Sequence, residues 1–243
     1  MVRILFCIVA FWLSSMATAA LAAPLQIVPE TVRSEQPSQS DARYDARYDA
    51  RYADSTGVSP VAGMQRPSAA QIALARVYLM RGFMNIFSLG IDDLGAKIQA
   101  NGIAATVANH ADAEIFVNQI VGRYRAGDRG PIILIGHSLG ADATIDMAQA
   151  LDRYDIPVAL VILFDGMAPH DVPKNVATAV NFTQQFELSP GLEFHGTISN
   201  VNLRGVAGID HLSIDKAPGL QAKALDYVLQ AVSAPPGPQA RRP

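Results

Sequence analysis

Residues 131–154 read PIILIGHSLGADATIDMAQALDRY, and this stretch decides the fold of the chain. The apolar run Ile132–Ile135 predicts a buried strand, and the helix-forming residues after the turn predict a helix. Ser138 lies between them, at the centre of Gly-His-Ser-Leu-Gly. Gly-X-Ser-X-Gly in this context is typical of a nucleophile elbow, a turn so tight that Gly136 and Gly140 must lack bulk. The pattern predicts a reactive serine at a helix N-terminus, where backbone N–H groups favour a developing anion.

The composition excludes several classes of protein. Hydrophobic residues make up 50% of the 243 residues and charged residues 17%, with a net charge of -3, which is typical of a globular domain. The part expected to fold contains no cluster of Lys and Arg, so nucleic acid is not an expected partner. The single cysteine, Cys7, lies near the start, so we expect no disulfide framework, zinc–thiolate site or cysteine nucleophile.

The first residues predict an export signal. Arg3 forms a short basic region, Ile4–Leu13 is apolar, and small residues follow to Ala23. Ala20-Leu21-Ala22 fits the small-X-small cleavage rule, so we expect a signal peptide over residues 1–23 and a periplasmic or secreted mature chain. An uncleaved membrane anchor is the alternative, which the short apolar run disfavours; we expect no stable anchor after cleavage.

The regions that flank the predicted domain are polar or rich in proline. Residues 24–67 contain Asp-Ala-Arg-Tyr three times in succession, over Asp41–Tyr52, and bury too little apolar surface to offset their ordering entropy. We predict a disordered linker; because the repeat has four residues, a short helix with aligned tyrosines or a cell-wall contact is the alternative. Residues 234–243 are rich in proline, and we expect them to form a disordered tail. The folded domain is expected over residues 68–233.

Between these ends, short apolar runs alternate with amphipathic helices, which predicts a parallel sheet covered on both faces. The continuous apolar run Val158–Phe164 predicts a strand buried on both faces, near the middle of the sheet. We expect six parallel strands, with the elbow strand in the middle. The predicted strands are Val77–Met80, Ile103–Ala108, Ile132–Ile135, Val158–Phe164, Val176–Phe182 and Asn200–Arg204. The predicted helices are Asp92–Ala100, a segment with Asp112 at its N-terminal position and apolar residues from Phe116 to Tyr124, the elbow helix, and Leu220–Val232.

From Arg76 to Val232 the chain resembles the α/β-hydrolase superfamily. The residues that carry the resemblance are Arg81–Met84, Gly136–Gly140, Asp165 after a core strand, and His211 before the closing helix. The resemblance implies a compact three-layer α/β sandwich with helices on both faces of a mostly parallel sheet. Compared with the full superfamily pattern the chain is short, so we expect a version of the fold without the first antiparallel strands and without a lid insertion. Within the superfamily the chain is most similar to small exported esterase-like or thioesterase-like hydrolases.

A nucleophilic serine needs a base within hydrogen-bond reach and a carboxylate that orients the base, and the family order is Ser, acid, His. His211 follows the last predicted strand through a glycine-containing loop, which is the family's position for the base. His170 follows its strand too closely, and His195 lies in a polar stretch where a surface histidine is expected. His137 is expected to shape the pocket, because the backbone direction points it away from Ser138.

The acid is predicted to be Asp165. It terminates the strand next to the elbow strand, at the carboxyl edge where ligands bind in open α/β sheets. In thioesterase-type hydrolases, which the chain resembles, the acid can follow this strand. Glu187 after the next strand is the alternative at the superfamily's more usual location, other carboxylates stay open, and Asp165 could instead cap a helix. Asp210 is adjacent to His211 and would have difficulty reaching its ring.

Acyl transfer also needs two N–H donors for the oxyanion, each contributing about 3 kcal/mol to the transition state. The amide of Leu139, after the nucleophile, is one expected donor. The other is expected from Phe83 or its neighbour Met84, because Gly82 lets that backbone turn toward the elbow. The alternative is that Gly82 only ends a strand, and nothing in the sequence decides whether Asn85 contributes.

These residues predict a serine hydrolase that cleaves a carboxylic ester or thioester through an acyl-enzyme, without a metal or organic cofactor. The expected substrate is a small-molecule or polymer ester, since export disfavours intracellular thioesters. The alternatives are an acyltransferase that uses the same three residues and a non-catalytic binding module on a hydrolase scaffold. The acyl group, the leaving group and the oligomeric state stay open.

Overall fold

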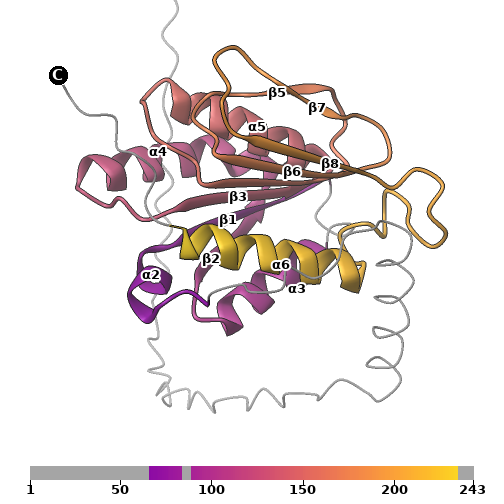
Figure 1. The fold of residues 1–243 in the computed structure, drawn as a ribbon, viewed down its shortest axis with the longest axis horizontal. Helices are drawn as coiled ribbons and strands as arrows, with labels where there is room; N and C mark the ends of the chain where they lie inside the picture. Colours follow the sequence, from indigo (N-terminus) through magenta and orange to yellow (C-terminus); the bar gives the residue numbers. More distant parts are fainter. Residues whose placement is uncertain (1–65, 84–88, 235–243) are drawn as a thin grey trace, which may run out of the picture. The chain divides into compact units, whose positions relative to one another are not determined.

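The central sheet consists of six parallel strands, as the sequence predicts. The computed structural model describes residues 66–83 and 89–234, and six strands in these ranges form a sheet in the order β2-β1-β3-β4-β6-β8 (Figure 1). All neighbours in this sheet are parallel, and the elbow strand β3 is internal, as predicted. The strands are β1 (Arg76–Arg81), β2 (Ala104–Asn109), β3 (Ile132–His137), β4 (Leu160–Phe164), β6 (Thr178–Thr183) and β8 (Thr197–Asn202).

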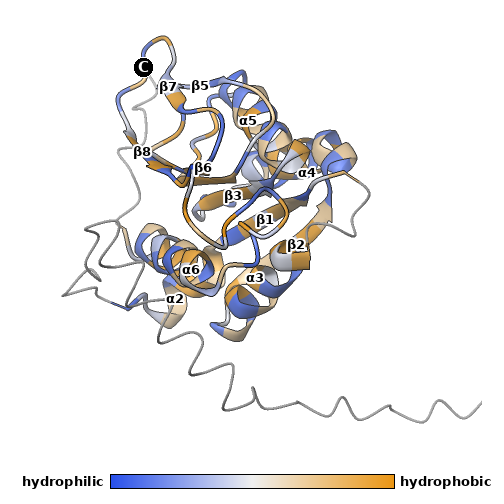
Figure 2. Cartoon of the chain, turned by 90° about the vertical axis from the view of Figure 1, so that its right-hand side faces the viewer, coloured by the Kyte–Doolittle hydropathy of each residue, from blue (hydrophilic) through white to orange (hydrophobic). Residues whose placement is uncertain are grey.

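Helices cover both faces of this sheet, so the fold is the expected three-layer α/β sandwich. Helices α3 and α6 pack on one face and α4 and α5 on the other (Figure 1). Because side chains alternate along a strand, Ile133 and Ile135 of β3 enter the core under α3 and α6, while Ile132 and Leu134 enter the core under α4 and α5. In Figure 2 these helices carry hydrophilic and hydrophobic residues on different sides. The helices are α3 (Leu89–Ala100), α4 (Ala113–Arg125), α5 (Leu139–Asp152) and α6 (Pro218–Ser233).

Two predicted strands are displaced, and three short elements were not predicted. The strand expected at Asn200–Arg204 lies slightly earlier in the chain, and the one expected from Val158 begins at Leu160, after an isolated bridge between Val158 and Val176. The unpredicted elements are helix α2, closed by a capping box between Ser68 and Gln71, and a separate two-stranded parallel sheet. These segments are too short to show a hydrophobic period. Their bounds are α2 (Ala69–Leu74), β5 (His170–Val172) and β7 (Leu188–Pro190).

Asp112 occupies the predicted position but makes a different contact. It is the N-cap residue of α4, yet its side chain makes no capping bond to that helix. Its carboxylate accepts instead from the amide of Asn109, and the Asn109 side chain accepts from Ala111, around the 3₁₀ turn η1 (His110–Asp112). A 3₁₀ turn directly before a helix has unpaired amides of its own, so the Asp112 carboxylate accepts from this turn instead of from α4.

The order of the strands creates a place for a ligand. From β1 the chain moves outward to β2, then returns to β3 on the other side of β1 and continues outward through β4, β6 and β8. The direction therefore reverses between β1 and β3, and open α/β sheets bind ligands at the carboxyl ends of strands at such a switch point. Ser138 follows β3 at this edge.

The predictions for residues 1–23, the repeat within residues 24–67, and the tail from residue 235 fall outside the described ranges. Within the ranges described, no helix combines the length and apolar character needed to cross a membrane.

Candidate active site

Ser138 stands on a strained turn between β3 and α5. Its backbone has φ 57 and ψ -127, a conformation that a residue with a side chain rarely adopts. Its amide donates to the carbonyl of Phe164 at 3.0 Å, so the turn is tied to the end of β4, and α5 begins at the next residue. The strain places the serine at the helix N-terminus, at the sheet edge that the topology marks for a ligand.

The two elbow glycines occupy positions where a side chain has no room. An ideal Cβ on Gly136 would lie 2.1 Å from the carbonyl oxygen of Gly140, and one on Gly140 would lie 2.1 Å from that of Met80. Both obstacles are backbone atoms, which cannot rotate away as a flexible side chain can. The end of β1 is therefore in direct contact with the elbow.

His211 lies within hydrogen-bond distance of the serine. Its Nε2 is 3.0 Å from Ser138 Oγ, and its Nδ1 is 2.8 Å from Asp165 Oδ2. An ionised carboxylate only accepts, so Nδ1 carries the proton and Nε2 is left to accept from the serine hydroxyl. The imidazole is half-buried, with 31% of the side chain exposed. The ring thus has the tautomer that a general base for Ser138 requires.

Asp165 is fully buried behind this histidine. Its backbone has φ 49, and its amide donates to Phe182 at 2.8 Å. The Oδ1 atom accepts from the amide of Gln184 at 2.8 Å, and Oδ2 faces His211. Burial acts to raise the pKa of Asp165, but the hydrogen bonds from His211 and from Gln184 outweigh it and leave the pKa below its usual value. Asp165 therefore stays ionised, as an orienting acid must.

The same contact changes the basicity of the imidazole. The hydrogen bond that His211 donates to Asp165 is the largest influence on the pKa of His211 and raises it above 6.5, while burial opposes the rise. The negative charges of Asp165, Asp215 and Asp210 add to the effect. A raised pKa makes the ring a stronger proton acceptor.

The other candidates of the sequence analysis have different surroundings. Glu187 is exposed, and the Nδ1 atom that it would need to orient is occupied by Asp165. Asp210 accepts from the amides of Leu212 and Ser213 in a turn of its own loop. His195 is exposed, and the His170 ring lies 2.9 Å from Asp142.

The expected oxyanion donors lie on either side of the elbow. Leu139 is the first residue of α5, so its amide has no acceptor within the helix. Phe83 follows β1, whose last residues contact Gly140, and its side chain is 60% exposed. Met84 and Asn85 lie outside the described ranges. The donation of the Leu139 and Phe83 amides to an oxyanion stays a prediction.

Two supporting residues were missed in the sequence. Gln184 holds Asp165 with its amide, and its side chain donates to the carbonyl of Ile209 at 2.7 Å, in the loop that carries His211. Asp142, in the first turn of α5, accepts from the amide of Met167 at 3.0 Å and from His170. Neither residue belongs to a recognisable motif, because each acts through contacts with segments distant in the sequence.

The described residues contain no group of three or more His, Cys, Asp or Glu side chains arranged to hold a metal ion.

Comparisons with known proteins return solved structures only. No protein-family model matches the chain, and no curated protein matches it. A cutinase-like protein from Cryptococcus sp. aligns at 17% identity and a TM-score of 0.47, over 70% of this chain and 99% of that one. A putative α/β-superfamily hydrolase from Xanthomonas campestris pv. campestris aligns at 16% identity and a TM-score of 0.35, over 61% of this chain and 98% of that one. The RedJ thioesterase of the prodiginine pathway in Streptomyces coelicolor aligns at 13% identity and a TM-score of 0.40, over 83% of this chain and 99% of that one.

Such low scores and identities say nothing about the substrate of this chain. The parallel six-stranded sheet, its helices on both faces and the strained turn after β3 nevertheless define the class: the chain has an α/β-hydrolase fold.

Proposed function

We propose that the chain is a serine hydrolase that cleaves a carboxylic ester or thioester through an acyl-enzyme. The observation that carries the proposal is the continuous hydrogen-bonded series from Ser138 Oγ through the His211 ring to Asp165, at 3.0 and 2.8 Å. The strained serine backbone supports it, because such strain concentrates at functional sites.

The reaction follows from the roles of these atoms. His211 Nε2 takes the hydroxyl proton while Ser138 Oγ attacks the carbonyl carbon, and the oxyanion is met by amides at the start of α5 and after β1. His211 then gives the proton to the leaving oxygen or sulfur, and the acyl group stays on the serine. A water molecule, deprotonated by the same ring, releases the acid and restores the hydroxyl. Asp165 keeps its charge throughout and stabilises the imidazolium.

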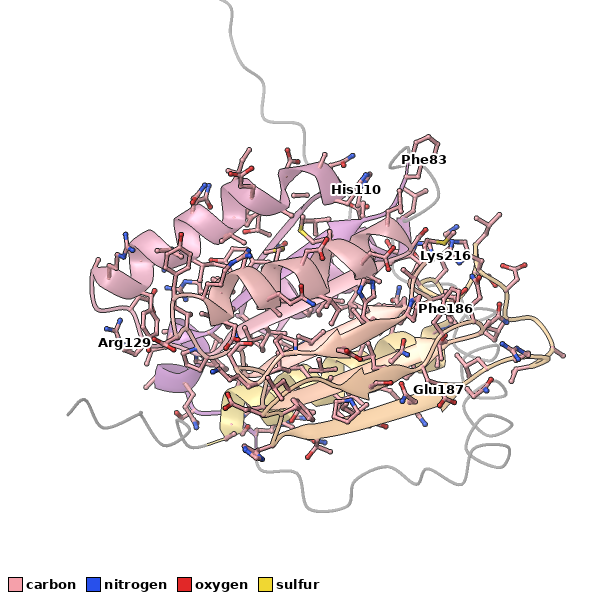
Figure 3. The ribbon with its side chains drawn as sticks, turned by 90° about the horizontal axis from the view of Figure 1, so that it is seen from above. Phe83, His110, Arg129, Phe186, Glu187 and Lys216 are labelled. Carbon is pink, nitrogen blue, oxygen red and sulfur yellow. The ribbon has the colours of Figure 1, made fainter. Side chains whose placement is uncertain are left out.

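Apolar side chains at this edge favour a substrate with an apolar part. Phe83, Met167, Phe186 and Leu212 are 60%, 45%, 38% and 50% exposed, on loops after β1, β4 and β6 and beside His211. In Figure 3, Phe83 and Phe186 lie toward one end of the ribbon, and Arg129 lies toward the opposite end. An apolar acyl or alkyl group bound here would cover these side chains and remove their apolar surface from water.

Labelling by a fluorophosphonate probe tests the nucleophile. The wild type should be labelled and should hydrolyse p-nitrophenyl esters, and Ser138→Ala should lose both properties while keeping its fold by circular dichroism. A folded wild type that takes no label and cleaves no ester or thioester would overturn the proposal.

A series of p-nitrophenyl esters of increasing acyl length tests the apolar part. Values of kcat/KM should rise with acyl length, because burying each added methylene contributes about 0.8 kcal/mol of favourable free energy. A profile that is highest for acetate would contradict the apolar substrate while leaving the acyl-enzyme intact. Product analysis with an added alcohol separates hydrolysis from acyl transfer.

A further inference from the structure

His137 is a buried histidine that the proposed reaction does not use. It is the last residue of β3, directly before the nucleophile, and only 1% of it is exposed. Its Nε2 lies 2.8 Å from the main-chain carbonyl oxygen of His211, and the two rings have centroids 5.1 Å apart. The contact joins the nucleophile strand to the backbone of the base.

The protonation state of this ring follows from its partner and its surroundings. A carbonyl oxygen only accepts, so the Nε2 of His137 must carry the proton. Burial lowers the pKa of His137 to about 4, and the hydrogen bond to His211 opposes this shift without reversing it. The ring is therefore neutral near pH 7, and its donation to His211 does not depend on pH in that range.

The loop that carries His211 combines packed residues with hydrogen bonds from outside the loop. A Cβ on Gly205 or Gly208 would meet no atom within 4 Å, whereas Val206 and Ile209 pack against the core under α3 and α6. Two side chains from elsewhere in the fold donate to its carbonyls: Gln184 to Ile209 and His137 to His211 itself. Of these two donors, His137 acts at the residue that must stay aligned.

We propose that His137 is a positioning residue, whose Nε2–H holds the main chain of His211 so that its ring stays between Asp165 and Ser138. The inference rests on the proposed function for its kinetic consequence, but the geometry that it explains is independent of the substrate. A displacement of about 1 Å in a reacting group can cost about 10²-fold in rate, so one hydrogen bond at this place has a large effect.

A second carboxylate near His137 does not extend a proton relay. Asp215 Oδ2 is 4.0 Å from the Nδ1 of His137, beyond hydrogen-bond reach, and Asp215 is fully buried. Burial raises the pKa of Asp215 to about 6, while the positive charge of Lys216 and, to a smaller extent, nearby backbone amides oppose the rise. A neutral imidazole forms no ion pair with this carboxyl, so the role of His137 is to hold His211 and not to move protons.

The groups that face His211 allow a prediction for its titration. Asp165, after β4, raises the pKa of His211 because it accepts a hydrogen bond from the ring. Asp210 and Asp215, in the same loop as His211, raise this pKa by their negative charge. His137, on β3, is uncharged near pH 7. If the loop loses its contact with His137, the His211–Asp165 hydrogen bond weakens on average. The pKa of His211 should then fall toward its ordinary value.

The test replaces His137 with and without a donor. His137→Leu removes the hydrogen bond, and kcat should fall about tenfold to 100-fold with KM nearly unchanged. The acid limb of the kcat/KM profile should also move to lower pH. His137→Gln, whose amide nitrogen can reach about the same place as Nε2, should recover most of the rate and the wild-type limb. His195→Leu, at an exposed histidine, is the matched control and should change neither.

A signal that needs no substrate separates this inference from the proposed function. The proton between His211 Nδ1 and Asp165 should give a low-field NMR resonance in the wild type and in His137→Gln. It should broaden or disappear in His137→Leu. Should His137→Leu fail to fold, His137→Asn serves, because its shorter side chain keeps polarity but falls short of the carbonyl. Unchanged kcat, acid limb and resonance in a folded variant without the donor would overturn the inference, whatever the substrate proves to be.

Discussion

At the scale of single residues, the site depends on two strained positions. Ser138 and Asp165 both have positive φ, at 57 and 49, and both end a buried strand. Each is tied to the neighbouring strand by its amide, which donates to Phe164 and to Phe182 respectively. The hydrogen bonds of a rigid sheet thus hold the strain that orients the hydroxyl and the carboxylate.

Asp165→Asn should lower kcat by about 10³-fold to 10⁴-fold with little change in KM. The amide would donate to Nδ1, so the proton would move to Nε2 and the ring could no longer accept from Ser138. Steady-state kinetics with a p-nitrophenyl ester measures the loss, and Glu187→Gln is the matched control. If Glu187→Gln lost about 10³-fold to 10⁴-fold in kcat while Asp165→Asn kept near-normal turnover, the role of the acid would move to Glu187.

The pH dependence of kcat/KM should have its acid limb above pH 6.5. The hydrogen bond that His211 donates to Asp165 raises the pKa of His211, so the ring stays protonated, and cannot act as a base, up to a higher pH than a free imidazole. Rates with a substrate that does not titrate give the limb directly. A limb below 6.5 would mean that another group is the base.

At the scale of elements, the elbow is formed by the packing of α5 on the ends of β1, β3 and β4. Gly140 contacts the carbonyl of Met80, and Asp142 accepts from Met167 and His170 in the segment after β4. The first turn of one helix therefore contacts both the elbow and the segment that follows Asp165. A change at these contacts should act on stability and on activity together.

Gly140→Ala should destabilise the chain by about 1–3 kcal/mol, because the new Cβ would lie 2.1 Å from the Met80 oxygen. Gly122→Ala in α4 is the matched control, since a Cβ there meets nothing within 4 Å. The control should stabilise by about 0.5–1 kcal/mol through helix propensity. Urea denaturation measures both, and equal effects of the two variants would contradict this account of the elbow.

The pair of His170 and Asp142 should make stability depend on pH. The hydrogen bond that His170 donates to Asp142 is the main cause that raises the pKa of His170, with burial opposing the rise. A group whose pKa is higher in the folded state stabilises fully below its unfolded pKa of about 6.5, and this contribution is lost as the pH rises through the folded pKa.

The melting temperature of His170→Gln relative to wild type tests the pair. Glutamine keeps a neutral hydrogen bond and removes only the charge, so the variant should be less stable than wild type at about pH 5.5 and close to it at about pH 9. His195→Gln, at an exposed histidine, should show no such trend. A deficit that grows with pH would contradict the assigned sign.

At the scale of the whole molecule, the site exists only because distant segments meet at one edge of the sheet. His211 is 73 positions from Ser138 and 46 from Asp165 in the sequence. The parallel order β1-β3-β4 brings the carboxyl ends of these strands together, and the loop between β8 and α6 returns across them.

We propose that the whole chain is exported and cleaved, as the basic and apolar start of the sequence predicts. Expression in a host with a periplasm should give a protein whose first residue lies near Ala23, measured by intact mass after fractionation. Deletion of residues 2–22 should leave the protein inside the cell. A periplasmic protein that still begins at Met1 would favour the uncleaved anchor.

The fold was more predictable than the site. Apolar runs located the strands, and the helices expected between β1, β2, β3 and β4 predicted that these strands are parallel; in the described part of the chain no helix separates β4, β6 and β8. The edges were less predictable: Asn200–Arg204 was displaced because β8 is only partly buried, and β5 and β7 are too short to show a period. Asp112 has the expected N-terminal position in α4, but its carboxylate accepts from the 3₁₀ turn before the helix.

The sequence by itself determined the strand, the turn and the helix around Ser138, because that motif is local; a Cβ on Gly136 would meet Gly140 only four residues away, whereas one on Gly140 would meet Met80 on β1. Only the tertiary structure decided which carboxylate faces His211 and what His137 holds. Asp165 meets the imidazole because β4 pairs directly with β3, whereas Glu187 follows β6, one strand further from the serine. The direction of a side chain across a sheet edge depends on strand order and twist, which no local pattern contains.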